Sequence, residues 1–296
     1  MISRKILILG CLLNCQSVWA GCADAGRDAN RTGEYDNAIK IFTACLADRS
    51  ANRSLLFFGR GVSYHGKRQY DRAVQDYTSS IELDSSTAGV YLFRGMCYYS
   101  KGQYNLAAQD YRIAASQGDA DAQYKLGWAY TTGEGVPKDG KESVKWFRLA
   151  ADQGYADAQF SLGQLHTLGR GVPVDEKEAV RWYRLAAGQG LAHAQFQLGA
   201  MYATGKGVPE DDMEAVKWYR LAAEQGNPGA QFALGEAHYF GRGVVEDFVK
   251  AYKWWNIVAA DGDEKARKNK EILKNKMTPQ DISKAQELSR EWVGAH

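Results

Sequence analysis

The sequence predicts an all-α protein, a right-handed α-solenoid built from stacked helix-turn-helix repeats. Glycine recurs every 36 residues in two series, one from Gly118 to Gly262 and one from Gly127 to Gly235. Tryptophan and alanine keep the same interval, and the preceding segment has a related period of 34 to 35 residues. Fixed periods of this length are typical of architectures in which each unit packs on its neighbours. We expect about three short units, four long units and a C-terminal capping helix pair.

The composition is that of a folded chain. Apolar residues make up 45% of the 296 residues and charged residues 24%, which excludes a disordered protein. The formal net charge is only +2, so no global basic field indicates nucleic-acid binding. No apolar run is long enough for an integral membrane span.

Residues 1–20 have the pattern of a secretory signal peptide. Arg4 and Lys5 precede the apolar stretch at residues 6–13, and Ala20 closes a cut site with Val18 two residues before it. A short buried N-terminal helix is the less favoured alternative. We therefore expect export, with a periplasmic or secreted mature protein.

A lipoprotein signal is the second alternative at the cut site. Ala20-Gly21-Cys22 resembles the end of such a signal, which would place a lipid anchor on Cys22. Trp19, however, stands where these signals usually carry leucine.

The repeat frame places Cys22 and Cys45 on the two helices of one hairpin. In an oxidising compartment, a bridge between them is favoured over free thiols.

The segment 21–117 carries the shorter period. Ala38, Ala73 and Ala107 are each followed four residues later by an aromatic residue, namely Phe42, Tyr77 and Tyr111. Phe147 follows Tyr111 by 36 residues. The second helices therefore continue in phase from the short units into the long units.

The segment 118–262 repeats a longer hairpin plan. Ala158, Leu162 and Leu165 share one helix face, and Gly163 within that helix predicts close approach of the neighbouring helix. Glycines and a proline at residues 169–173 end the helix. Asp175 is expected to cap the second helix, whose apolar stripe contains Ala179, Trp182, Leu185 and Ala186.

These motifs resemble two repeat families. Gly61-x-x-Tyr64 with Ala73 and Tyr77, and its copy from Gly95 to Tyr111, resemble tetratricopeptide repeats. The plan AQFxLGxxYxxGxGVPxDxxxAVxWYRLAAxQG at residues 124–262 is similar to the Sel-1-like repeat. The resemblance implies an interaction scaffold or adaptor, and bacterial Sel-1-like proteins with signals are typically periplasmic or secreted.

The tail at residues 263–296 lacks the plan but is expected to form a helical C-terminal cap. Thr278 and Pro279 predict a helix start, and Ile282, Ala285 and Leu288 give that helix an apolar face. The expected division is thus 1–20 signal peptide, 21–117 tetratricopeptide-like, 118–262 Sel-1-like and 263–296 cap.

The sequence contains none of three common motifs: the nucleophile motif of serine hydrolases, the phosphate-binding loop of nucleotide-binding proteins and the zinc-binding motif of metalloproteases. The Gly133-x-Gly135 loop recurs in four copies as a turn and lacks the residues of a phosphate loop. His166 and His238 occupy one repeat position two units apart, too far to share a metal ion. We therefore expect no metal, no cofactor and no enzymatic activity.

Functional residues are expected on the first helices, where side chains that the core does not need are free to vary. The N-terminal half carries an apolar and aromatic set there, which predicts a concave groove for a peptide or protein partner. The simpler alternative is that any solenoid exposes some apolar residues on its surface. The set is Phe58, Val62, His65, Leu92, Met96, Tyr99 and Trp128.

The favoured function is a non-enzymatic protein-interaction scaffold of the bacterial envelope or secreted space. One alternative is a β-lactam-binding or hydrolysing enzyme, because cysteine-rich relatives of the Sel-1-like group are linked to that activity. The four Sel-1-like units here contain no cysteine, which weakens the link. The other alternative is an assembly subunit of envelope or polysaccharide machinery.

Overall fold

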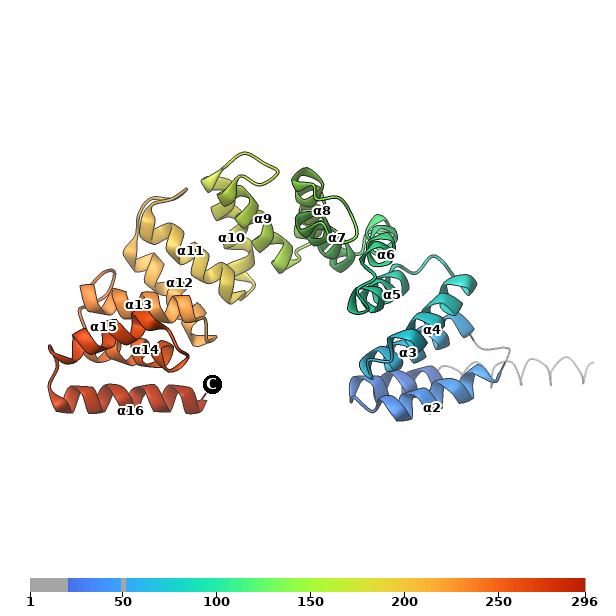
Figure 1. The fold of residues 1–296 in the computed structure, drawn as a ribbon, viewed down its shortest axis with the longest axis horizontal. Coiled ribbons are helices and arrows are strands. Elements are labelled where there is room, and N and C mark those ends of the chain that lie inside the picture. The colour runs from blue at the N-terminus through green and yellow to red at the C-terminus, as the bar shows by residue number, and fades with distance from the viewer. Residues whose placement is uncertain (1–20, 49–51, 296) are drawn as a thin grey trace, which may run out of the picture. The chain divides into compact units, whose positions relative to one another are not determined.

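The computed structural model describes residues 21–48 and 52–295, so the expected signal peptide at residues 1–20 lies outside the described residues. Within those ranges the regular secondary structure is entirely helical (Figure 1). Residues 21–31 form a first helix. The others are α2 (Tyr35–Leu46), α3 (Arg53–Gly66), α4 (Tyr70–Leu83), α5 (Ala88–Ser100), α6 (Tyr104–Ser116), α7 (Ala120–Thr132), α8 (Gly140–Asp152), α9 (Ala156–Leu168), α10 (Glu176–Gly188), α11 (Ala192–Thr204), α12 (Asp212–Glu224), α13 (Pro228–Phe240), α14 (Phe248–Ala260), α15 (Glu264–Lys274) and α16 (Pro279–Ala295).

The chain divides into two compact units, Met1–Ala150 and Ala151–His296. The boundary falls within α8 and does not coincide with the expected change of repeat type after residue 117. Because each hairpin of a solenoid packs mainly on its neighbours, a change of repeat type need not create a seam. The division by repeat type therefore stays a prediction.

In the first unit, α3 packs with α4 and α5 with α6 as antiparallel hairpins, and α4 contacts α5 while α6 contacts α7. Side-chain caps start two of these helices. Asn52 accepts a hydrogen bond from the Leu55 backbone N–H at 3.2 Å, and Asp119 accepts one from Ala122 at 2.8 Å. Each cap satisfies a backbone donor that has no partner inside the helix.

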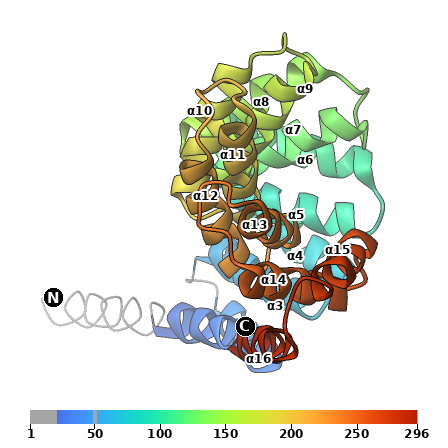
Figure 2. The same cartoon turned by 90° about the vertical axis from the view of Figure 1, so that its left-hand side faces the viewer.

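In the second unit, the pairs α9/α10, α11/α12 and α13/α14 repeat one hairpin (Figure 2). Asp175 caps α10 as expected, accepting a hydrogen bond from the Glu178 backbone N–H at 3.0 Å. Gly169 ends α9 with a φ of 66°, a left-handed conformation that favours glycine. Each turn is therefore determined by residues within its own repeat.

An aromatic ring of each second helix lies against a glycine of the first helix. A Cβ added to Gly163 would lie 2.5 Å from a ring carbon of Tyr183, closer than real side-chain contacts. The sequence predicted a close approach at Gly163, and the structure shows that a side-chain ring makes it. The pairs are Gly61–Tyr77, Gly95–Tyr111, Gly127–Phe147, Gly163–Tyr183, Gly199–Tyr219 and Gly235–Trp255.

The residue directly before each of these glycines and the residue directly before each of these rings differ between the short repeat units (period 34 to 35 residues) and the long repeat units (period 36 residues). In a short unit, Arg94 donates from Nε and Nη2 to the two carboxylate oxygens of Asp110, both at 2.8 Å. Arg60 and Asp76 form the same bidentate pair. In a long unit the corresponding positions hold Leu and Trp. The short units thus use a largely buried ion pair where the long units carry apolar residues.

One expectation about an apolar face is wrong. Leu185, assigned to the apolar stripe of α10, is 44% exposed, because Tyr183 takes the inward position beside Trp182. In α16, Ala285 is buried, and Ile282 and Leu288 are partly buried on the same face. The indole of Trp292 packs at 5.9 Å on that of Trp254 in α14, which anchors the C-terminal helix.

Candidate functional site

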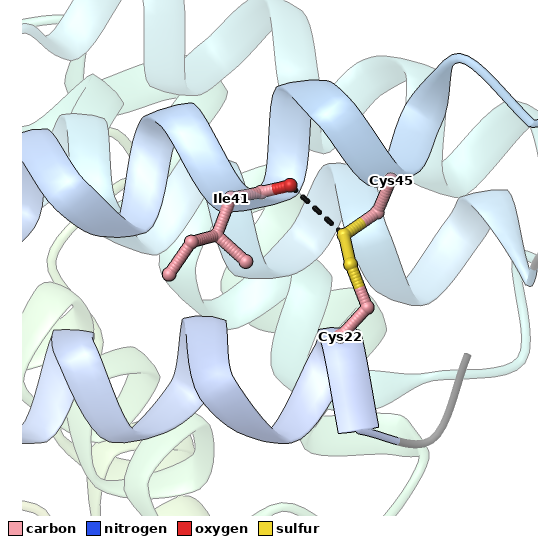
Figure 3. Close-up of a disulfide and its surroundings, with 3 residues drawn as sticks. All are labelled: Cys22, Ile41 and Cys45. Carbon is pink, nitrogen blue, oxygen red and sulfur yellow. Dashed lines mark hydrogen bonds between the residues drawn. A yellow bond between two sulfur atoms is a disulfide. The ribbon is translucent and has the colours of Figure 1, made fainter. Parts of the chain in front are cut away.

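The helix at residues 21–31 is joined to α2 by a disulfide between Cys22 and Cys45 (Figure 3). The two Cα atoms are 6.5 Å apart, within the usual range for a disulfide. Cys22 is part of the same pair that the sequence analysis favoured. A bridged Cys22 has no free thiol to carry a lipid, so this geometry and the lipid anchor exclude one another.

The residues expected to form one groove lie in three different surroundings. Phe58, Val62 and His65 are half-buried at the junction of α3, α4 and α5. The ring of Phe93 packs on Phe58 at 5.6 Å and on His65 at 6.1 Å between ring centroids. Burial lowers the pKa of His65. This part of the set is an aromatic packing cluster.

Leu92 and Met96 belong to the core around α5, α6 and α7. Leu92 is only 6% exposed and packs in one cluster with Tyr111 and Leu126, so its assignment to an open groove was wrong. Met96 is half-buried and packs against the same cluster. Both residues therefore belong to the packing between these helices.

Tyr99 and Trp128 line a pocket formed by α5, α6, α7 and the loop after α7. The pocket has a volume of about 240 Å³. Trp128 is 45% exposed, Tyr99 42% and Tyr104 38%. The lining residues are Tyr99, Tyr104, Ala107, Ala108, Tyr111, Tyr124, Lys125, Trp128, Ala129 and Glu134.

Glu134 and the tyrosines form the polar part of this aromatic pocket. Tyr99 donates its hydroxyl to Oε2 of Glu134 at 3.1 Å, and its ring meets Tyr104 edge-on at 5.1 Å between centroids. Burial and then the hydrogen bond to the carboxylate raise the pKa of Tyr99. Lys125 pairs with Asp121 one turn earlier, Nζ to Oδ1 at 3.4 Å.

Sequence reasoning selected Tyr99 and Trp128 from the ten lining residues of the aromatic pocket, and it did not select Tyr104, Tyr124 or Glu134, which complete the aromatic and acidic walls. Tyr104 recurs as Tyr35 and Tyr70 in the shorter repeats, and Tyr124 stands where the other long units carry Phe, so neither is conspicuous in the sequence. Glu134 lies in a loop that was read as a structural turn. Comparison between repeats could have found Glu134, because the other copies carry a basic residue there.

The second unit has a hollow at the corresponding register. It is lined by Phe196, Tyr219, Phe232, Glu236, Asp263 and Lys265 among others, and its volume is about 390 Å³. Glu236 takes the repeat position of Trp128, and burial raises its pKa. The hollow therefore lacks the exposed aromatic side chains of the first unit.

No other group in the described ranges suggests chemistry. No cluster of His, Cys, Asp and Glu there could hold a metal ion. His166 and His238 are buried in the packing between helices, and burial raises the pKa of the free Cys97 thiol to about 12. None of the helices between residues 21 and 295 is long and apolar enough to cross a membrane.

Comparison with known proteins decides the family. The Sel1 repeat model matches residues 120–155, 156–191, 192–227 and 228–263. The structure is similar to a Sel1 repeat protein from Oxalobacter formigenes, with a TM-score of 0.69 and 30% identity over 80% of this chain and 70% of that one. The chain belongs to the Sel1 repeat family. No functionally curated protein matches it.

Two further structures share the fold of this Sel1 repeat protein. One is c5321, a protective antigen of uropathogenic Escherichia coli strains, with a TM-score of 0.57 and 26% identity over 93% of this chain and 68% of that one. The other is the C-terminal part of a TPR repeat-containing protein from Cytophaga hutchinsonii, with a TM-score of 0.54 and 17% identity over 83% and 98% of the two chains. Folds of this kind generally serve as protein-interaction scaffolds.

Proposed function

We propose that this Sel1 repeat protein is a non-enzymatic scaffold that binds a segment of a partner protein in the aromatic pocket of its first unit. The observation that carries the proposal is the exposure of three large aromatic side chains, Tyr99, Tyr104 and Trp128, around one cavity. Large exposed aromatic groups that gather at one place mark interaction sites.

The fold does not need the exposed side chain of Trp128. The glycine contacts of the two hairpins use Tyr111 and Phe147, which are buried. The position of Trp128 is occupied by Gln, Ala and Glu in the other three long units, which form the same hairpin. Trp and Tyr at the centre of an interface commonly contribute about 2 kcal/mol or more each when a partner covers them.

The proposal includes export to the periplasm or the secreted space. The basic, apolar and small-residue order of residues 1–20 supports it. The Cys22–Cys45 disulfide supports it independently, because such bridges persist in oxidising compartments and are rare in the cytosol.

The test uses peptides selected from a displayed random library on the mature wild-type protein. Dissociation constants of the selected peptides are then measured for the Tyr99→Ala, Trp128→Ala double variant. We expect binding to weaken by at least about 100-fold, because two hot spots of about 2 kcal/mol each exceed the roughly 2.8 kcal/mol that a 100-fold change requires, with an unchanged circular dichroism spectrum.

The matched control is the Gln164→Ala, Glu236→Ala double variant, which changes the position of Trp128 in two other units. We expect its affinity to stay within about threefold of wild type. Unchanged affinity in the Tyr99→Ala, Trp128→Ala variant would show that the partner binds elsewhere. Loss of helical structure in that variant would show that the two side chains belong to the core.

A further inference from the structure

We propose that the aromatic pocket selects a positively charged side chain, an arginine or lysine presented by an extended basic segment of the partner protein. This inference rests on the proposed function and adds the chemistry of the occupant. Three observations carry it: the charge of Glu134 relative to the other repeats, the lack of a cation that compensates it, and the aromatic walls beside it.

Glu134 reverses the charge found at its position in the rest of the protein. The three other long units carry Arg170, Lys206 and Arg242 between the same two glycines. The loop backbone is common to all four, since Gly133 and Gly135 have the same left-handed φ as their counterparts. The turn therefore does not require an acid, and the acid stands only beside the aromatic pocket.

The carboxylate of Glu134 has a hydrogen-bond donor but no counter-ion within residues 21–48 and 52–295. Its partner there is the neutral hydroxyl of Tyr99. Lys125, the cation that lines the pocket, is paired with Asp121 on its own helix. Lys125 and Glu134 are the two charged residues of the lining; with Asp121 counted beside them, the three charges sum to −1. A cation of the partner would find an acceptor whose charge is not already neutralised.

The aromatic walls suit the same occupant. A guanidinium or ammonium group is attracted to the face of Trp or Tyr within about 6 Å of the ring centroid. The Trp128 indole is nearly half exposed and makes no ring or cation contact with any residue that the structure describes. Aromatic faces beside a carboxylate can hold the charged end and the apolar stem of one basic side chain together.

An adjoining hollow favours a protein segment over a free amine. It shares Tyr104 and Glu134 with the aromatic pocket and extends along the start of α6, past Gln103, Asn105 and Leu106. Its volume is about 480 Å³, enough for the residues that flank the basic side chain. A small free amine would leave this hollow empty.

The test uses synthetic nonapeptides of Gly and Ser whose central residue is Arg, its neutral isostere citrulline, or Glu. Binding is followed by NMR on protein with ¹⁵N-labelled tryptophan, with the Trp128 indole signal assigned through Trp128→Phe. We expect the Arg peptide to bind wild type about tenfold more tightly than the citrulline peptide, and the Glu peptide to bind most weakly.

The decisive variant is Glu134→Arg, which installs the residue of the other repeats and is expected to fold normally. It should remove the preference for Arg over citrulline and favour the Glu peptide. Glu134→Gln should remove the preference without reversing it. Arg170→Glu is the matched control, because it makes the opposite change in the equivalent loop of the second unit and should leave the preference intact.

Trp128→Ala separates this inference from the proposed function. Binding to Trp128→Ala, which lacks the indole reporter, is measured by isothermal titration calorimetry beside wild type. If the Arg and citrulline peptides bind wild type equally and both are lost in Trp128→Ala, the pocket binds segments without selecting charge, and only this inference is overturned. A preference for Arg that survives in Glu134→Arg also overturns it. If no peptide shifts the Trp128 signal, this inference is overturned, while peptides selected from the random library still test the proposed function.

Discussion

Adding one methyl group beneath the ring of Tyr183 should destabilise the second unit. In Gly163→Ala the new Cβ would lie 2.5, 2.6 and 3.0 Å from three ring carbons. The ring would have to retreat by about 1 Å to restore ordinary carbon contacts near 3.5 Å. It has little freedom to do so, because Tyr183 is 2% exposed and its hydroxyl lies 3.2 Å from that of Thr167.

Two opposing effects set the size of the change. Replacing Gly by Ala inside a helix stabilises by about 1 kcal/mol, whereas overpacking a core costs about 1–3 kcal/mol. The steric effect should win here, since three ring carbons of a held side chain are involved. We expect a net loss of about 1 to 2 kcal/mol in the free energy of unfolding. Urea denaturation followed by circular dichroism measures it.

A double-mutant cycle with Tyr183→Leu tests the cause. With the ring removed, Gly163→Ala should become stabilising by up to about 1 kcal/mol, so the coupling between the two sites is about 2 to 3 kcal/mol. Gly188→Ala is the control, because a Cβ at Gly188 meets no atom within 4 Å. If Gly163→Ala is as stable as wild type with Tyr183 present, the contact between ring and glycine does not determine the hairpin packing.

Three further outcomes are expected. The intact mass of the exported protein should lack two protons, from a Cys22–Cys45 bridge, and carry no acyl group. Arg94→Leu should destabilise by about 3 to 5 kcal/mol, because Asp110 is buried and would lose its counter-charge, and replacing both residues by Leu should cost less. Burial and the nearby Lys250 lower the pKa of His238, so the unfolded state binds a proton more readily. Stability from this group should be lost as pH falls below about 6.5, and His238→Tyr should reduce that loss.

Each of these expectations has a matched check. Free thiols on both cysteines would remove the bridge, and an acyl mass would show that Cys22 is lipidated. Equal destabilisation by the single and double changes at the buried ion pair would show that charge is not the cause. Tyr is a conservative choice at position 238, because Tyr202 holds that position in the preceding unit and accepts a hydrogen bond from Arg184 at 3.0 Å. An identical pH profile of the melting temperature in wild type and His238→Tyr would refute the role of that histidine.

Part of the aromatic pocket could be predicted from the sequence alone. Tyr99 and Trp128 were identified because they belong to the apolar and aromatic half of the first-helix positions that vary between repeats. Tyr104 and Glu134 were not, because one lies on a second helix and the other in a turn. Their contact with Tyr99 joins residues 5 and 35 positions apart in the chain, and helix packing makes that contact.

The sequence by itself determined the helices, their turns and their order, because these depend on local effects that recur in every unit. The cap at Asp175 and the left-handed glycine at Gly169 are examples, since each requires only its own neighbours in the chain. Tertiary packing decided which side chains are buried. The apolar face of a helix is wider than the area that the neighbouring helices cover, so some of its residues stay exposed. Only the tertiary structure shows that Leu185 faces outward, that Leu92 is buried and that Trp128 is left exposed.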